Sequence, residues 1–449
     1  MTQNTKTASL DTLAQLIQAA KKAGADAADA LLVESVSSSV SYRLGKLEDV
    51  ERSESADLGL RVFIGQRVAF VSSTDFSADA LAALAPRAVA MAKLAPEDQF
   101  ACLAPRERLA KAIPDLELED KDEPSAQWLI DQARASEGAA MAVAGVTNSE
   151  GGGASFGRSA IALATSEGFV GGYAGTSLSI GVAVLAGEGV GMERDYDHAS
   201  ARHVCDLDSA EKIGRSAGEK AVARLNPRKV KSQGVPVIFD PRVSAGLVGN
   251  FAGAISGASI ARGVSFLKDR LGKQVFADGI SIIDDPHIKR GQRSKPFDGE
   301  GVANRKQALI EKGVLTTWLL DCSSAKQLGL ETTGHAARGT GGPPRPAASN
   351  LYMAAGKLSP KELMADIVSG FYVTELMGMG VNGVTGDYSQ GAAGFWIENG
   401  EIAFPVSEIT IAGNMKDMFL NLTPADDLVF RYGTNAPTIR VEGMTIAGS

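Results

Sequence analysis

The alternation of hydrophobic and polar residues predicts a helix followed by antiparallel strands at the start of the chain. Residues 9–24 carry leucine and isoleucine at helical spacing, and the segments after them alternate as β-strands do. The last two of these strands are expected to pair across a turn at Gly65-Gln66. A long alanine-rich helix then begins after Asp75 or Ser77, since both residues are suitable N-caps.

The same order of elements recurs after an acidic stretch with little periodicity. A helix is predicted to start near Ser125, strands follow it, and a further helix has Asp208 as its expected N-cap and Glu211 at the capping-box position. Because only two copies of the pattern occur, we expect two related layers rather than a solenoid.

The last part of the chain is richer in strands. Hairpins are predicted at 308–320 and 395–404, the second across Asn399-Gly400, which is a strong signal for a two-residue turn. Between them, a helix is expected with Ser359 as its N-cap. Strands and helices are segregated and show no repeated β-α-β alternation, which is typical of the α+β class.

These patterns divide the chain into four parts. Residues 1–98 are expected to be an N-terminal α/β unit, 99–124 a linker, 125–228 a middle α/β unit and 229–449 a larger β-rich C-terminal domain. The predicted fold is therefore α+β, with antiparallel sheets, flanking helices and two helix–strands–helix units before the C-terminal domain.

One predicted helix, "DPRVSAGLVGNFAGAISGAS" at residues 240–259, has an unusual composition. Small residues recur at every fourth position and would form one stripe: Ala245, Gly249, Gly253 and Gly257. Each interior glycine costs a helix roughly 0.5–1 kcal/mol relative to alanine, so the stripe needs an explanation. One explanation is a helix that packs closely on a sheet, and the other is a helix whose functional side chains have been replaced by small ones.

Composition narrows the class of protein. The 449 residues carry a net charge of −8 and the pI is near 5.3, which argues against a dominant phosphate-binding surface, so nucleic acid is not an expected partner. Three cysteines lie far apart at Cys102, Cys205 and Cys322, which suits reduced thiols in a cytosol. No apolar run reaches the length of a membrane span or a signal peptide, so we expect a soluble, cytoplasmic protein without a membrane partner.

Chemistry-bearing motifs are scarce. Four histidines occur, and no H-E-x-x-H or C-x-x-C motif is present. Ser389 lies in a glycine-rich G-x-x-S-x-G segment, which is not the nucleophile-elbow spacing. His335 could serve Ser389 as a base only if the fold brings the two together, which leaves an independent hydrolase as an alternative.

A long C-terminal stretch carries a resemblance to a known family. The segment "TELMGMGVNGVTGDYSQGAAGFWIENGEIAFPVSEITIAGN", together with "GAISGASI", "PFDGEGV" and "TTGHAARG", closely resembles the TldD/PmbA family. The match is strong after about residue 235 and is closer to the PmbA branch, also called TldE, than to the TldD branch. The family has been linked to peptide processing and to modulation of DNA gyrase.

The resemblance implies that this chain lacks the metal site of its relatives. TldD-like proteins carry an H-E-x-x-x-H helix and a C-terminal cysteine that bind a catalytic metal. Laid without gaps on this sequence, the motif falls on Gly246, Leu247 and Phe251, and none of these can ligate a metal or take a proton. We therefore expect no catalytic residue, metal ligand or cofactor in this chain, and expect zinc only in a TldD-like partner.

The function implied is that of a metal-free subunit in a TldD–TldE peptidase complex that acts on unfolded peptides. When the partner is absent, the chain is expected to be able to form a homodimer. A binding protein that modulates DNA gyrase is a further alternative for its function. Four polar residues of a loop rich in glycine and proline are predicted to face the shared substrate cleft: His335, Arg338, Arg345 and Asn350. Trp318 and Trp396, on the two C-terminal hairpins, are predicted to contribute to the subunit interface.

Overall fold

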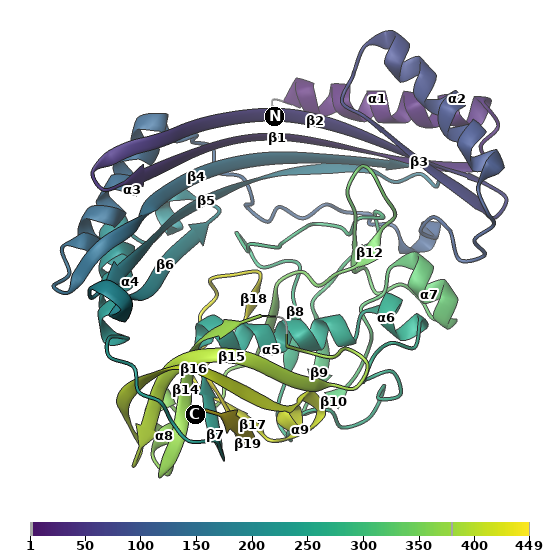
Figure 1. Cartoon of the computed structure of the whole chain (residues 1–449). Coiled ribbons are helices and arrows are strands. Elements are labelled where there is room, and N and C mark those ends of the chain that lie inside the picture. The colour runs from purple at the N-terminus through teal and green to yellow at the C-terminus, as the bar shows by residue number, and fades with distance from the viewer. Residues whose placement is uncertain (1–2, 379, 449) are drawn as a thin grey trace.

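A single six-stranded antiparallel sheet contains the strands of both predicted units (Figure 1). The computed structural model describes residues 3–378 and 380–448. In chain order the strands are β1 (Ala27–Arg43), β2 (Lys46–Ile64), β3 (Arg67–Ser73), β4 (Val146–Thr165), β5 (Val170–Ala186) and β6 (Glu193–Ala201). Their order in the sheet is β3-β2-β1-β4-β5-β6. Strands β1 and β4 pair from Asp29 opposite Thr165 to Tyr42 opposite Gly152. The prediction of two layers is therefore wrong, because the two units join edge to edge.

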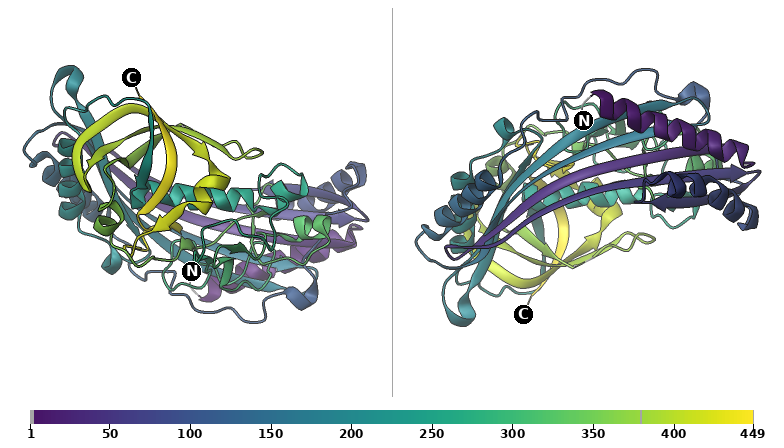
Figure 2. Two further views of the ribbon diagram at one scale, coloured as in Figure 1. Left: turned by 90° about the horizontal axis from the view of Figure 1, so that it is seen from below. Right: turned by 90° about the horizontal axis from the view of Figure 1, so that it is seen from above.

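Two pairs of helices cover one face of this sheet, and the C-terminal domain lies against the other (Figures 1 and 2). The helices are α1 (Gln3–Lys22), α2 (Ala78–Leu94), α3 (Ala126–Met141) and α4 (Ala210–Ala223). Alternation along β1 explains the arrangement. Ala30 belongs to the core under α1 and α2, and Val40 belongs to the core under α3 and α4. Leu31 points the opposite way and packs with Phe297 of the C-terminal domain.

Serine side chains set the starts of three of these helices. Ser77, one of the two N-caps predicted for α2, and Ser125, near which a helix was predicted to start, each accept a hydrogen bond from a backbone N–H of the first turn. The N-cap of α4 is Ser209 rather than the predicted Asp208, because the Ser209 hydroxyl accepts from the Lys212 backbone N–H. Asp208 instead forms an exposed ion pair with the Lys212 ammonium, 2.7 Å away.

The C-terminal domain combines a closed sheet with a smaller open one. The first contains β7 (Gln233–Phe239), β14 (Ser369–Met377), β15 (Asp387–Glu398), β16 (Glu401–Asn414), β17 (Leu422–Pro424) and β19 (Ile439–Ala447). Strand β16 pairs with β15 on one side and with β19 on the other, which closes the sheet into a barrel. The second sheet has the order β10-β9-β8-β13-β18, formed by β8 (Ile282–Asp284), β9 (Gln307–Glu311), β10 (Val314–Leu315), β13 (Leu351–Met353) and β18 (Thr434–Asn435). With the helices, these sheets confirm the predicted α+β class.

Short elements complete the domain: α5 (Pro241–Ala254), α6 (Gly257–Ala261), α7 (Cys322–Leu328), β11 (Ala336–Ala337), β12 (Arg345–Pro346), α8 (Pro360–Met364) and α9 (Met415–Leu420). The predicted turn at Asn399-Gly400 joins β15 to β16, and both residues have positive φ, 51° and 82°, as a type I′ turn requires. Ser359 and Glu362 form the predicted capping box of α8.

The main hydrophobic core of the C-terminal domain surrounds α5. The Phe251 ring of α5 packs edge-on against Phe276 and Phe419, with ring centroids 5.2 and 6.2 Å away. Trp318 and Trp396 are buried in the same core. The prediction that these two tryptophans form an interface is therefore wrong, since their side chains already fill the domain interior. Within the described residues, every helix is too short or too polar to cross a lipid bilayer.

Candidate functional site

The three glycines within α5 form an open face of that helix. The helix begins at Asp240, whose carboxylate accepts a hydrogen bond from the Arg242 backbone N–H. Gly246, Gly249 and Gly253 are exposed, and a Cβ atom added to any of them would meet no atom within 4 Å. Only Gly257, at the start of α6, is closely packed, because a Cβ there would lie 2.6 Å from side-chain atoms of Leu320 and Ser324. Close packing therefore does not explain the glycines of α5.

The burial of residues along α5 shows which positions of the metal motif would face solvent and which would face the core. Leu247 and Phe251 point into the core, and Phe251 is 0% exposed. The ungapped placement of the metal motif therefore puts two of its three positions in the core, away from the exposed face of the helix. A shift of one residue puts the three positions on Ala245, Gly246 and Asn250, none of which is buried. None of these residues is ionisable. Across the residues that the structure describes, no group of three or more His, Cys, Asp and Glu side chains could hold a metal ion.

Three of the four predicted cleft residues have buried side chains, and only Arg345 is exposed. The His335 side chain is 3% exposed and the Arg338 side chain 1%. Asn350 is buried, with its amide nitrogen donating to the Ser294 hydroxyl and the Asp285 carbonyl. His335 and Asn350 are therefore held inside the domain by hydrogen bonds to distant segments, and the Arg338 guanidinium is held by Asp29.

His335 belongs to a buried hydrogen-bonded chain. Its Nε2 lies 3.2 Å from Asp284 Oδ2, and its Nδ1 lies 2.8 Å from the Thr333 hydroxyl. Burial would raise the pKa of Asp284, but the hydrogen bonds from His335 and Ser349 outweigh it and hold that pKa below its usual range. Ser389 lies exposed on β15. Because both ring nitrogens of His335 are engaged, it is not available as the base for Ser389.

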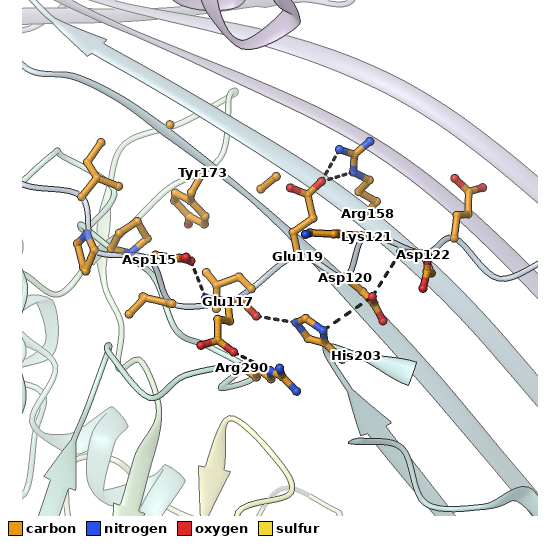
Figure 3. Close-up of a pocket in the computed structure, with 18 of the residues that line it drawn as sticks. Asp115, Glu117, Glu119, Asp120, Lys121, Asp122, Arg158, Tyr173, His203 and Arg290 are labelled. Atoms are coloured by element: carbon orange, nitrogen blue, oxygen red, sulfur yellow. Dashed lines mark hydrogen bonds and ion pairs between the residues drawn. The ribbon is translucent and has the colours of Figure 1, made fainter. Parts of the chain in front are cut away.

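A large cavity lies elsewhere, between residues 113–123 and strands β4 and β5 (Figure 3). Its volume is about 940 Å³, and Arg158 of β4, Tyr173 of β5 and His203 also line it. The sequence assigned this segment to a featureless linker. A signal was present, however, since Leu116 and Leu118 are buried and alternate with Glu117 and Glu119, as in a half-buried extended strand.

Ion pairs and hydrogen bonds hold the acidic segment in place (Figure 3). Glu117 pairs with Lys289 and with Arg290, and these contacts lower the pKa of Glu117. The Arg158 guanidinium donates to Glu119 across 2.6 Å. His203 Nε2 donates to the Glu117 carbonyl, with 2.8 Å between the two atoms. The segment is therefore a fixed wall of the cavity, although it contains no helix or sheet strand.

The cavity is suited to binding rather than to nucleophilic chemistry. Its volume falls in the usual range for ligand sites, and its walls mix carboxylates, cations and apolar side chains. Burial raises the pKa of Tyr173 to about 12, so its phenol stays protonated and can both donate and accept a hydrogen bond. These groups could hold an extended peptide by its backbone.

A buried cluster of charges joins the large sheet to the C-terminal domain. Asp29 of β1 contacts the guanidinium groups of both Arg61 of β2 and Arg338. Burial would raise the pKa of Asp29, but the two arginines outweigh it and lower that pKa. Glu300 lies 3.8 Å from Arg61. The Asp29–Arg338 pair therefore connects the large sheet to the loop that precedes β12.

Comparison with known proteins identifies the class of protein. Family models described as PmbA/TldA metallopeptidase domain 1, central domain and C-terminal domain match residues 28–92, 119–225 and 232–448. The chain therefore belongs to the PmbA/TldD metallopeptidase family. Within it, the chain falls on the PmbA branch, also called TldE. Metalloprotease PmbA of Escherichia coli O157:H7 is 40% identical over 94% of this chain and 92% of that protein. A PmbA homolog of Haemophilus influenzae is 39% identical over 96% and 94%.

Solved structures agree in fold. A candidate modulator of DNA gyrase from Bacteroides thetaiotaomicron superposes with a TM-score of 0.90 at 26% identity, over 98% of each chain. TldE from Thermococcus kodakarensis gives a TM-score of 0.86 at 24% identity, over 97% of this chain and 100% of that one. The second likeness is one of fold alone.

Proposed function

We propose that this chain is a metal-free subunit of a peptidase complex, in which a TldD-like partner supplies the zinc site and unfolded peptide is the substrate. The observation that carries this proposal is the open face of α5. The chain has no ionisable side chain from Val243 to Ala261, yet Gly246, Gly249 and Gly253 leave the helix surface uncovered. A helix with exposed glycines and no ionisable side chain leaves space for a substrate but supplies no catalytic group.

Two further features support a peptide as the substrate. An exposed glycine face lets another backbone approach the helix closely, since no side chain intervenes. The 940 Å³ cavity offers hydrogen-bond donors and acceptors of the kind that the backbone of an extended chain requires. Membership of a metallopeptidase family agrees with a role in proteolysis.

The experiment is reconstitution. The chain and a TldD-like partner from the same cell would be purified without tags, analysed separately and together by sedimentation, and assayed on an unstructured peptide with and without chelator. We expect a mixed complex, peptide turnover only in the mixture, loss of turnover with chelator, and zinc only in the partner. Chelator-resistant turnover by this chain alone, or no association at micromolar concentration, would contradict the proposal.

A pair of variants tests the role of α5 itself. Gly249→Trp fills the open face without entering the core, so we expect peptide turnover by the complex to fall while the subunits still associate. Ala83→Trp is the matched control, because Ala83 is an exposed small residue of α2, on the opposite side of the large sheet. Equal turnover in the two variants would remove α5 from the substrate path.

A further inference from the structure

A second, smaller cavity lies where the large sheet meets the C-terminal domain. Its volume is about 130 Å³. Apolar side chains form most of its wall, among them Leu31, Ile161 and Leu163 from the sheet and Phe297 from the C-terminal domain. Lys295 and Arg338 line it as well. It is therefore an apolar chamber with two cationic side chains on one side.

These two side chains have hydrogen-bond donors to spare. The Arg338 side chain is 1% exposed and its Nη1 lies 2.8 Å from Asp29 Oδ2. Its Nε finds no hydrogen-bond partner among the described residues. The Lys295 ammonium donates to the Ala336 carbonyl across 3.0 Å. An ammonium group has three donors, so this contact satisfies only one of them.

The carboxylate in the same wall, that of Asp298, already accepts hydrogen bonds from backbone N–H groups. Asp298 also lines the cavity, and its Oδ1 accepts from the backbone N–H groups of Glu300 and Val302, each at 2.9 Å. Its Oδ2 accepts from the Ala336 N–H at 3.0 Å. A buried donor without a partner costs free energy, whereas a satisfied acceptor gains little from a new donor. A ligand that fits this wall must therefore bring acceptor atoms.

Size and polarity together define the ligand. A cavity of about 150 Å³ lined by apolar side chains holds a benzene ring, so this one suits a branched aliphatic or small aromatic group. We propose that the cavity binds a small carboxylate with such a group, its oxygens on Lys295 and Arg338 and its apolar part among Leu31, Leu163 and Phe297. The carboxylate is either a free acid or the C-terminal residue of a peptide, and the peptide case rests on the proposed function.

The position of the cavity favours a peptide C-terminus as the source of the carboxylate. Tyr173 lines both this cavity and the 940 Å³ cavity, so the two are neighbours. A peptide whose last residue occupied the small cavity could continue along the acidic segment in the large one.

The test is direct calorimetric titration of the purified full-length chain, without partner or turnover. The free-acid probes are 4-methylpentanoate and phenylacetate, each compared with its primary amide. The peptide probe is a hexapeptide ending in leucine, with either a free or an amidated C-terminus. We expect saturable binding of a carboxylate form and at least about tenfold weaker binding of the matching amide, since charge-assisted hydrogen bonds are lost. Binding of the peptide but not the small acids would identify a peptide C-terminus, and the reverse would identify a free acid.

Variants locate the site. Lys295→Met keeps the aliphatic stem and removes the ammonium, so we expect affinity for the carboxylate to fall at least about tenfold. Lys273→Met is the matched control at an exposed lysine of the same domain and should bind as the wild type does. Ala337→Phe blocks the cavity from an exposed position in its wall without removing a charge, so it remains informative if Lys295→Met misfolds. Absence of saturable binding, equal affinity for acid and amide, or unchanged binding by Ala337→Phe would overturn the proposal. None of these outcomes depends on whether the chain joins a peptidase complex.

Discussion

Replacement of Glu300 by glutamine should remove part of the pH dependence of folding. Glu300 is 2% exposed. Its Oε2 accepts from the Cys322 backbone N–H at 2.8 Å, and Oε1 lies 3.8 Å from Arg61. Burial raises the pKa of Glu300 to about 7, because these two contacts do not replace its lost hydration and Asp298 lies nearby.

The sign and size of the effect follow from linkage. The folded state binds the Glu300 proton more tightly than the unfolded state does. Its stabilising contribution is therefore fully present below the ordinary pKa of 4.5 and is lost as the pH rises through about 7. At 1.36 kcal/mol per pKa unit, the difference corresponds to about 3 kcal/mol of unfolding free energy. Glu300→Gln mimics the protonated carboxyl, so its excess stability over the wild type should be below about 1 kcal/mol near pH 5 and should grow to about 3 kcal/mol near pH 8.

Urea denaturation at pH 5, 6, 7 and 8, followed by fluorescence of the buried Trp318 and Trp396, measures this difference. Subtracting one profile from the other removes the contribution of the titrating groups that do not interact with Glu300. Glu311→Gln, which replaces an exposed carboxylate of β9, is the control and should leave the profile unchanged. Parallel wild-type and Glu300→Gln profiles from pH 5 to 8 would refute the argument that burial governs this carboxyl.

Three other substitutions have defined outcomes. Asp29→Asn leaves Arg61 and Arg338 buried without their counter-ion, so the unfolding free energy should fall by about 3–5 kcal/mol in urea titrations. Phe251→Ala empties the space between Phe276 and Phe419 and should cost about 3–5 kcal/mol in the same assay. Gly249→Ala adds a methyl group to open space on a helix, so it should raise the unfolding free energy by about 0.5–1 kcal/mol; a loss would reveal a contact on that face.

Local features of the fold were predictable because the residues that determine them are neighbours in sequence. Ser77 and Ser125 cap helices through backbone groups a few residues away, and Asn399-Gly400 forms its turn through its own backbone angles. The pairing of β1 with β4 was not predictable in this way. Backbone hydrogen bonds between strands carry no side-chain signature, so the same two patterns are compatible with two layers or with one sheet.

The burial of the loop residues could not be predicted from the sequence for a related reason. His335, Arg338 and Asn350 lie among glycines and prolines, and such a setting is typical of an exposed loop. Their partners Asp284, Asp29 and Asp285 come from distant segments. A polar side chain is buried when such a partner exists, and the sequence does not show which partners meet.

The three glycines in the open face of α5 connect the fold to the proposed function. Each costs the helix roughly 0.5–1 kcal/mol relative to alanine, and together they cost about 2 kcal/mol. No neighbouring atom prevents a Cβ at Gly246, Gly249 or Gly253, so the packing of the domain does not require them. The remaining explanation is the space above the helix. If that space admits peptide, Gly249→Ala should stabilise the chain while Gly249→Trp slows the complex, and this opposition between stability and turnover would not arise on a helix face without a function.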